Sequence, residues 1–556
     1  MTQIAIDVPR HTRTAGSAGR SVVHALHGMV ATSHPLAALV GVDILKRGGT
    51  AVDAAIAANA MLGLVEPMSC GIGGDLFAQV WEARSGRVFG LDASGRAPRQ
   101  ASASAFTSRG LTHMPSDGPL SWTVPGAVAG WDALRSRFGA LPLRDLLEPA
   151  TTTAEEGFPV SEVIASFWQG AEDKLRTRPE SATTFLPGGR APQCGEVIRN
   201  PELARTYREI GREGRDAFYR GRIARAIAGY SEDVGGLLLE ADLAACEASW
   251  VDPISTTFRD VEVLELPPPG QGLTVLQILN MLEGDDLAAL GPESADFWHL
   301  FVEAKKLAYA DRARFYADPE FARVPVERLL SKEYGRERRK LIDPHRARVG
   351  VPPGAVASDT VYIAAVDAQR NCCSLIQSIY QHFGSGMTPP GLGFALQNRG
   401  AGFSLDPSHP NRIEPGKRPF HTIIPALALR EGRPWFVFGV MGADMQPQGQ
   451  VQVLVNVLDF GMTVQAAGEA PRIEHVGSAT PGGYPEAPGG GLVLAEDGIP
   501  EATLAELARR GHDVARTSRN GGGYQGILID PQTGALQAGT ESRSDGSAIG
   551  NISSRP

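Results

Sequence analysis

Residues 359–367 contain a threonine that could first cut the chain and then act as a catalyst. Thr360 opens an apolar run after a polar segment that contains Pro and Gly. A Thr there can attack the peptide bond on its amino side through an N-to-O acyl shift, and hydrolysis of the ester would separate Asp359 from Thr360. The new α-amine, with an ordinary pKa of about 8, can then act as the general base for the Thr hydroxyl. Thr at a strand start is also ordinary β-branched propensity, so the segment alone permits a purely structural reading.

Composition and charge narrow the classes of partner. The 556 residues are 42% hydrophobic and 21% charged, which is typical of a soluble globular protein. A net charge of −9 with no basic block gives no electrostatic case for a nucleic-acid or anionic-membrane partner. Residues 1–20 lack the apolar run of a secretory signal, and no window of about 18 apolar residues occurs. These observations predict a cytoplasmic protein with a small-molecule substrate.

The elements that must position Thr360 follow from hydrophobic periodicity. Residues 35–64 show helical apolar spacing interrupted by Gly48 and Gly49, which predicts a helical hairpin with a glycine stop. Further helices are predicted over 201–212, 221–230, 274–282 and 297–315. Strands are predicted over 361–366, 373–379, 423–429, 435–440 and 526–529. A helix-rich first part before a strand-rich second part indicates an α+β or layered α/β fold.

Nine motifs, in order along the chain, resemble the γ-glutamyltransferase family of N-terminal-nucleophile hydrolases from about residue 28 to about residue 550. Three lie near the amino end, at 28–37, 44–55 and 65–74. The others are Pro-Pro-Pro-Gly-Gln-Gly at 267–272, Tyr-Ala-Asp-Arg at 309–312, the strand that begins at Thr360, Phe-Gly-Ser-Gly at 383–386, Gly-Lys-Arg-Pro at 416–419 and Asp-Phe-Gly-Met at 459–462.

This resemblance implies a four-layer αββα sandwich and a two-part enzyme. Cleavage between Asp359 and Thr360 would give a larger subunit, residues 1–359, and a smaller subunit, residues 360–556, from one precursor. The two subunits would form one catalytic unit. Whether two such units associate as a dimer is left open.

The resemblance also assigns roles around the nucleophile. Ungapped alignment from Thr360 places Ser378 where the family has a second hydroxyl that orients the nucleophile. Gly442 and Ala443 fall where two successive backbone N–H groups form an oxyanion hole. Their alternatives are a Ser on the polar face of a strand and a turn at a strand end. Nucleophile, base and oxyanion donors would all come from the protein, so no metal or organic cofactor is expected.

The positions that would recognise a γ-glutamyl donor depart from the family pattern. Ser94 stands where an Arg binds the donor carboxylate, and Gly402 where an Asp binds the donor ammonium. An unpaired donor charge in a closed site costs about 2–5 kcal/mol of binding, which disfavours glutathione-like donors. A bulkier, more cationic set of residues instead favours a short anionic substrate: Arg96, Tyr380, Arg399, His421 and Thr422. Arg399 or Arg96 is expected to bind the substrate carboxylate, and a surface ion pair is the alternative role for Arg399.

These departures resemble the oxamate amidohydrolase branch of the family. That resemblance implies hydrolysis of a small amide beside a carboxylate, with release of ammonia and oxalate. Two other functions stay open: a γ-glutamyltransferase, glutathione hydrolase or related acylase, and a catalytically silent scaffold. The retained Thr360, Ser378 and Gly442 argue against the scaffold.

Overall fold

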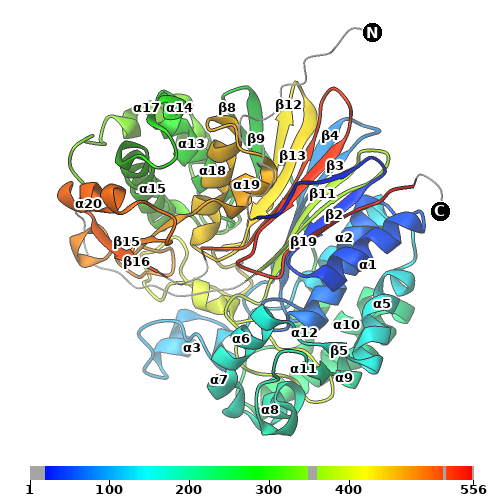
Figure 1. The fold of residues 1–556 in the computed structure, drawn as a ribbon. Coiled ribbons are helices and arrows are strands. Elements are labelled where there is room, and N and C mark those ends of the chain that lie inside the picture. Colours follow the sequence, from blue (N-terminus) through cyan, green and yellow to red (C-terminus); the bar gives the residue numbers. More distant parts are fainter. Residues whose placement is uncertain (1–18, 349–359, 518–520, 554–556) are drawn as a thin grey trace.

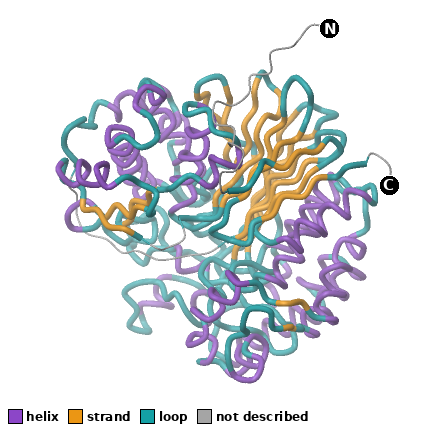
Figure 2. The backbone as a smooth tube through the Cα atoms, in the orientation of Figure 1, coloured by secondary structure: helices purple, strands orange, loops and turns teal. Residues whose placement is uncertain are grey.

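The computed structural model describes residues 19–348, 360–517 and 521–553, and its centre is two seven-stranded sheets packed face to face (Figures 1 and 2). All neighbouring strands in both sheets are antiparallel. The first sheet runs in the order β19 (Ser547–Gly550), β2 (Met29–Thr32), β10 (Val361–Val366), β11 (Cys372–Ser378), β3 (Asp75–Glu82), β4 (Arg87–Ala93) and β7 (Ser249–Val251). The second runs in the order β1 (Val23–Ala25), β18 (Leu536–Thr540), β17 (Tyr524–Ile529), β13 (Arg433–Val440), β12 (Ala426–Arg430), β9 (Val261–Glu265) and β8 (Ile254–Phe258).

Helices cover the outer face of each sheet, so the four-layer αββα sandwich is confirmed (Figure 1). The first sheet is covered by α1 (Pro35–Lys46) and α2 (Ala51–Val65). The second is covered by α13 (Gly272–Leu282), α18 (Met445–Leu458) and α19 (Val464–Glu469), with α15 (Ala295–Phe315) packed on α13. Between the sheets, Gln79 Nε2 donates to the Leu264 and Pro425 carbonyls at 2.9 and 2.6 Å.

The helical hairpin predicted over 35–64 is present. Gly48 has a φ of +87°, a left-handed conformation that glycine adopts without steric cost, and it separates α1 from α2. Thr50 then caps α2, because its hydroxyl accepts from the Asp53 amide while the Asp53 carboxylate accepts from the Thr50 amide. Every residue of α2 is buried, because the first sheet covers one side of this helix and other helices cover the rest.

The other predicted elements also appear, with shifts of a few residues at some ends. The helices are α9 (Pro201–Glu213), α11 (Arg222–Asp233), α13 and α15, and the strands are β10, β11, β12, β13 and β17. The periodicity missed β2, β3 and β4, which lie in the part expected to be helical, and it missed α18. Strands β2 and β3 and helix α18 are buried almost throughout, and a fully buried segment shows no alternation from which its type can be read.

No helix in the described ranges is both long and apolar enough to cross a membrane.

Candidate active site

Thr360 lies at one end of the first sheet, immediately before β10, and is 1% exposed. Strand β10 is buried along its whole length between β2 and β11, which fixes the position of the residue that precedes it. Val361 pairs with Gln377, so Ser378 comes next to Thr360 at the same sheet end. The Thr360 Oγ1 lies 3.4 Å from Ser378 Oγ. The structure therefore brings together the two hydroxyls that the resemblance assigned to the site.

A second polar group reaches the Thr360 hydroxyl. Gln446, the second residue of α18, has its Nε2 3.4 Å from Thr360 Oγ1, and its Oε1 accepts from the Ile424 amide at 3.1 Å. A buried amide donor beside a nucleophilic oxygen restricts the directions in which that oxygen can point. Gln446 was not among the site residues predicted from the sequence. Its available signal was position alone, since it follows Gly442 and Ala443 by only a few residues.

The backbone at Gly442 and Ala443 has the conformation needed to present two amides to one point. Both have positive φ, +104° at Gly442 and +47° at Ala443. A non-glycine residue with positive φ is uncommon and is often found at functional sites. Neither amide donates a hydrogen bond to another residue in the described part of the chain. Two adjacent free donors fit the expected oxyanion hole.

Arg399 is a buried cation that has unused hydrogen-bond donors. Its side chain is 0% exposed, its Nη1 donates to Thr422 Oγ1 at 2.8 Å, and its guanidinium lies 4.2 Å from the centre of the Tyr380 ring. Its Nε and Nη2 have no hydrogen-bond partner among the described residues. Burial lowers the pKa of Arg399 to about 10, so the group is still charged at neutral pH. Such an arrangement can bind a carboxylate through two N–H groups.

His421 pairs with Asp75, which the sequence analysis also did not identify. His421 Nε2 lies 3.1 Å from Asp75 Oδ2, and both side chains are fully buried. Burial, together with the Arg399 cation, holds the pKa of His421 well below its usual value, so the contact is a hydrogen bond from a neutral imidazole. Burial raises the pKa of Asp75 to about 6, while Arg399 and the hydrogen bonds to the carboxylate oppose the rise. Asp75 is thus a titrating neighbour of the buried guanidinium.

This pair predicts a pH-dependent affinity for anionic substrates. Below a pH of about 6 the Asp75 carboxyl is neutral, and above it the carboxylate repels a second anion near Arg399. The KM for a carboxylate-bearing amide should therefore rise by roughly tenfold or more as the pH increases through about 6, because a charge within about 10 Å contributes more than about 1.4 kcal/mol at an effective dielectric constant near 20. Asp75→Asn keeps the side-chain size and should flatten this rise. A rise of the same size for an uncharged amide, or in the Asn variant, would contradict the assignment.

The other arginine considered for the substrate carboxylate is engaged elsewhere. Arg96 Nη2 lies 2.7 Å from Glu320 Oε1, and Arg96 Nη1 donates to the Gly416 carbonyl at 2.9 Å. Its side chain is 34% exposed, as in an ordinary surface ion pair. The structure therefore groups Tyr380, Arg399 and Thr422 and leaves Arg96 outside that group.

The two positions that depart from the γ-glutamyl pattern are closed by neighbours. Ser94 Oγ donates to Asp92 Oδ1 at 2.6 Å and is buried. A Cβ at Gly402 would lie 2.9 Å from the Phe420 carbonyl oxygen, so an Asp there would require the backbone to move. Neither position supplies a charged group to a ligand.

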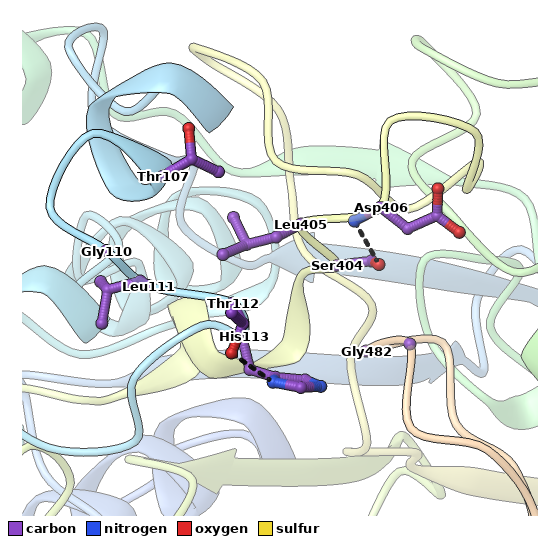
Figure 3. Close-up of a pocket in the computed structure, with 10 residues that line it drawn as sticks. Thr107, Gly110, Leu111, Thr112, His113, Ser404, Leu405, Asp406 and Gly482 are labelled. Carbon is purple, nitrogen blue, oxygen red and sulfur yellow. Dashed lines mark hydrogen bonds between the residues drawn. The ribbon is translucent and has the colours of Figure 1, made fainter.

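A groove of about 520 Å³ lies beside the Arg399 segment (Figure 3). It is lined by the 107–113 loop, by residues 404–406, which follow η3 (Arg399–Gly402), and by Gly482 and Gly483. Asn411 Nδ2 donates to the carbonyls of Gly402 and Pro481 at 2.7 and 2.9 Å, which ties the 482–483 turn to η3. The groove is thus one short loop away from the buried guanidinium.

No group of three or more metal-ligating side chains (His, Cys, Asp or Glu) is found in residues 19–348, 360–517 and 521–553. The expected independence from metals and cofactors stays a prediction.

Known proteins resemble this chain in both sequence and fold. Residues 37–551 match the family model described as gamma-glutamyltranspeptidase. The glutathione hydrolase-like YwrD proenzyme of Bacillus subtilis is 37% identical over 94% of this chain and 98% of its own. The oxamate amidohydrolase proenzyme of Klebsiella pneumoniae is 36% identical, and the match covers 94% of this chain and 98% of the relative's chain. The crystal structure of cephalosporin acylase from Bacillus halodurans superposes with a TM-score of 0.90 at 42% identity, covering 99% of this chain and 100% of that one. The names of these three proteins refer to different substrates.

Proposed function

The chain belongs to the gamma-glutamyltranspeptidase family and is a hydrolase of amide bonds, and we propose that its substrate is a small amide whose acyl part carries a carboxylate. The observation that carries this proposal is Arg399, a fully buried cation with two unused donor nitrogens beside Thr422. Arg399 makes no direct ion pair among the described residues, since the nearby Asp75 carboxylate attracts it without a hydrogen bond, and an anionic ligand could bind its unused donors. Oxamate, in which the carboxylate adjoins the amide carbonyl, is the smallest such substrate and our specific candidate.

The proposed reaction uses only groups of this chain and water. The α-amine of Thr360 accepts the hydroxyl proton as Oγ1 forms a bond to the amide carbonyl carbon. The Gly442 and Ala443 amides stabilise the resulting oxyanion, while Ser378 and Gln446 orient Oγ1. The C–N bond then breaks, the amine leaves with that proton, and water hydrolyses the acyl ester to regenerate Thr360. Arg399 binds the substrate carboxylate throughout, so that the carbonyl faces the nucleophile.

The same threonine is proposed to create its own amine by cleaving the precursor. Cleavage after Asp359 would release the amino group of Thr360 and leave residues 1–359 and 360–556 as two subunits. Asp359 lies outside the described residues. Arg348 is the last residue described before that segment, and both its backbone amide and its carbonyl make hydrogen bonds. Its amide donates to Glu303 Oε2 at 3.2 Å, and its carbonyl accepts from Lys306 Nζ at 3.0 Å. These contacts anchor the chain at Arg348 to helix α15.

A second candidate function, hydrolysis of amides with a bulky amine part, is favoured by the groove beside η3. Its volume of about 520 Å³ is in the range of ligand pockets and far exceeds what ammonia occupies. The similarity to a cephalosporin acylase is consistent with this alternative. Both candidates share the carboxylate-bearing acyl part and differ in the leaving amine.

A panel of amides separates these functions. We expect kcat/KM for oxamate and related carboxylate amides, tested as unsubstituted amides and as anilides, to be at least about tenfold higher than for a γ-glutamyl anilide. The reason is that Ser94 supplies no cation for the donor carboxylate and Gly402 supplies no anion for the donor ammonium. Preference for the γ-glutamyl donor would overturn the proposal.

The groove is tested with the same panel. Gly482 does not have positive φ, and a Cβ there would meet no atom closer than 3.5 Å, so Gly482→Phe should fold and fill the groove. If bulky amines bind there, this variant should lose anilide hydrolysis while it retains release of ammonia. Equal effects on both leaving groups would exclude the groove as the amine site.

A further inference from the structure

Gln271 touches both halves of the proposed site. It is the last residue before α13, within the Pro-Pro-Pro-Gly-Gln-Gly motif, and it is 0% exposed. Its Nε2 donates to the Thr422 carbonyl at 2.7 Å and to the Ala443 carbonyl at 2.8 Å. One carboxamide group therefore joins two loops that are otherwise separated by strands β12 and β13.

Each of these two loops holds a different part of the substrate-binding machinery. Thr422 accepts from the Arg399 guanidinium at 2.8 Å, so it positions the group proposed to bind the carboxylate. Ala443 contributes one of the two amides of the oxyanion hole, which receives the carbonyl oxygen. Because the Nε2 hydrogens are held in one rigid plane, Gln271 constrains the distance between the carboxylate-binding group and the oxyanion hole.

Arg312 fixes the orientation of Gln271 from the opposite side. Its Nη1 donates to Gln271 Oε1 at 2.5 Å and to Asp444 Oδ1 at 2.7 Å, and the Arg312 side chain is 0% exposed. A guanidinium can only donate, so Oε1 must face it and Nε2 must face the two carbonyls. Asp444 directly follows Ala443, so this bond also fixes the oxyanion loop.

We propose that Gln271 is a positioning residue that sets the length of acyl chain the enzyme accepts. In a substrate with a carboxylate at one end and the scissile carbonyl at the other, the number of intervening atoms must match the distance between Arg399 and the oxyanion hole. With Gln271 in place that distance is held to one value, and one chain length fits both ends. This inference rests on the proposed function, because it requires the carboxylate to bind at Arg399.

The test compares kcat/KM for a series of amides that differ only in the carbons between carboxylate and amide, namely oxamate, malonamate, succinamate and glutaramate. The wild type should prefer one length by at least about tenfold over its neighbours. Gln271→Met has similar volume and cannot hold the two carbonyls, and it should lose about 10- to 100-fold on the preferred length, with all lengths then within about threefold of one another. A uniform decrease over the whole series, or none, would overturn the proposal.

Two further variants separate positioning from general damage to the core. Gln271→Glu can still accept from Arg312 but cannot donate to the carbonyls, so it should show the same loss of length selectivity even if Gln271→Met folds poorly. Gln277→Met, on the helix α13 that follows Gln271, is the matched control. Gln277 is buried and bonds to Asp311 and Tyr316, and within the described residues it makes no hydrogen bond to Thr422 or Ala443, so its variant should keep the wild-type preference. Loss of selectivity in the Gln277 variant as well would contradict the assignment to Gln271.

Arg399→Met, assayed on a carboxylate amide and on an uncharged amide, distinguishes this inference from the function on which it rests. If Arg399→Met has no effect specific to carboxylate substrates, the proposed function fails. If Arg399 behaves as expected and the Gln271 variants keep the wild-type length preference, only the present inference fails.

Discussion

Thr360→Ala is expected to remain one uncut polypeptide of about 59 kDa and to lose about 10⁴-fold or more of the hydrolytic activity. The substitution removes the only atom that can attack in both steps, the peptide bond in maturation and the substrate amide in turnover. It also leaves no free α-amine at position 360, so the general base is lost together with the nucleophile. The alanine side chain is smaller but fits the same buried position, so the fold should be preserved.

A denaturing gel and amino-terminal sequencing measure this prediction. The wild type should give two fragments, and the smaller one should begin Thr-Val-Tyr-Ile. Thr360→Ser is the matched control, because it keeps a hydroxyl and should still be cut, more slowly. Cleavage of the Ala variant at this position, or a small fragment with another first residue, would show that Thr360 is not the nucleophile of maturation.

Arg399→Met should lower kcat/KM for a carboxylate-bearing amide by about 10- to 100-fold, equivalent to the 1.5–3 kcal/mol of a charged hydrogen bond. Methionine fills much of the same buried volume and leaves no cation for the substrate anion. The thermal stability of the variant should change little, because the desolvation cost of the buried guanidinium offsets its hydrogen bond to Thr422 and its attraction to the Asp75 carboxylate.

The effect of Arg399 is measured with a double-mutant-type cycle, in which one change is made in the protein and the other in the substrate. Oxamate and its uncharged diamide, oxamide, are compared in wild type and variant, and only the difference between the two substrates reports the contact of the guanidinium with the carboxylate. Arg96→Met is the control, because Arg96 pairs with Glu320 and its loss should change neither substrate by more than about twofold. If the carboxylate effect instead follows Arg96, the pocket has been assigned to the wrong cation.

Local properties of the chain account for what was predictable. The hairpin of α1 and α2 follows from apolar spacing and from Gly48, whose left-handed backbone any reader of the sequence can anticipate. Strand β10 has the bounds that its β-branched and apolar residues indicated. Thr360 could be proposed as a candidate nucleophile because the polar segment before it and the apolar run after it place it at the start of that strand. The ordered motifs extended this reasoning to the family, and the family to the αββα sandwich.

Which residues form the proposed substrate site around Arg399 could not be predicted in this way. Arg96 and Arg399 are both arginines outside strands, and only the folded chain shows that one is paired near the surface and the other is buried with free donors. Asp75 and His421 are 346 residues apart, and Gln271 and Ala443 are 172 apart.

The sequence by itself therefore determined the family, the hairpin of α1 and α2 and strand β10, and it led to the prediction that Thr360 is the nucleophile. Only the tertiary structure decided which charges are left uncompensated and which loops are joined. The physical reason is that helix and strand periodicity depends on neighbours along the chain. Desolvation and hydrogen-bond pairing at the site depend instead on groups that meet only when the two sheets pack together.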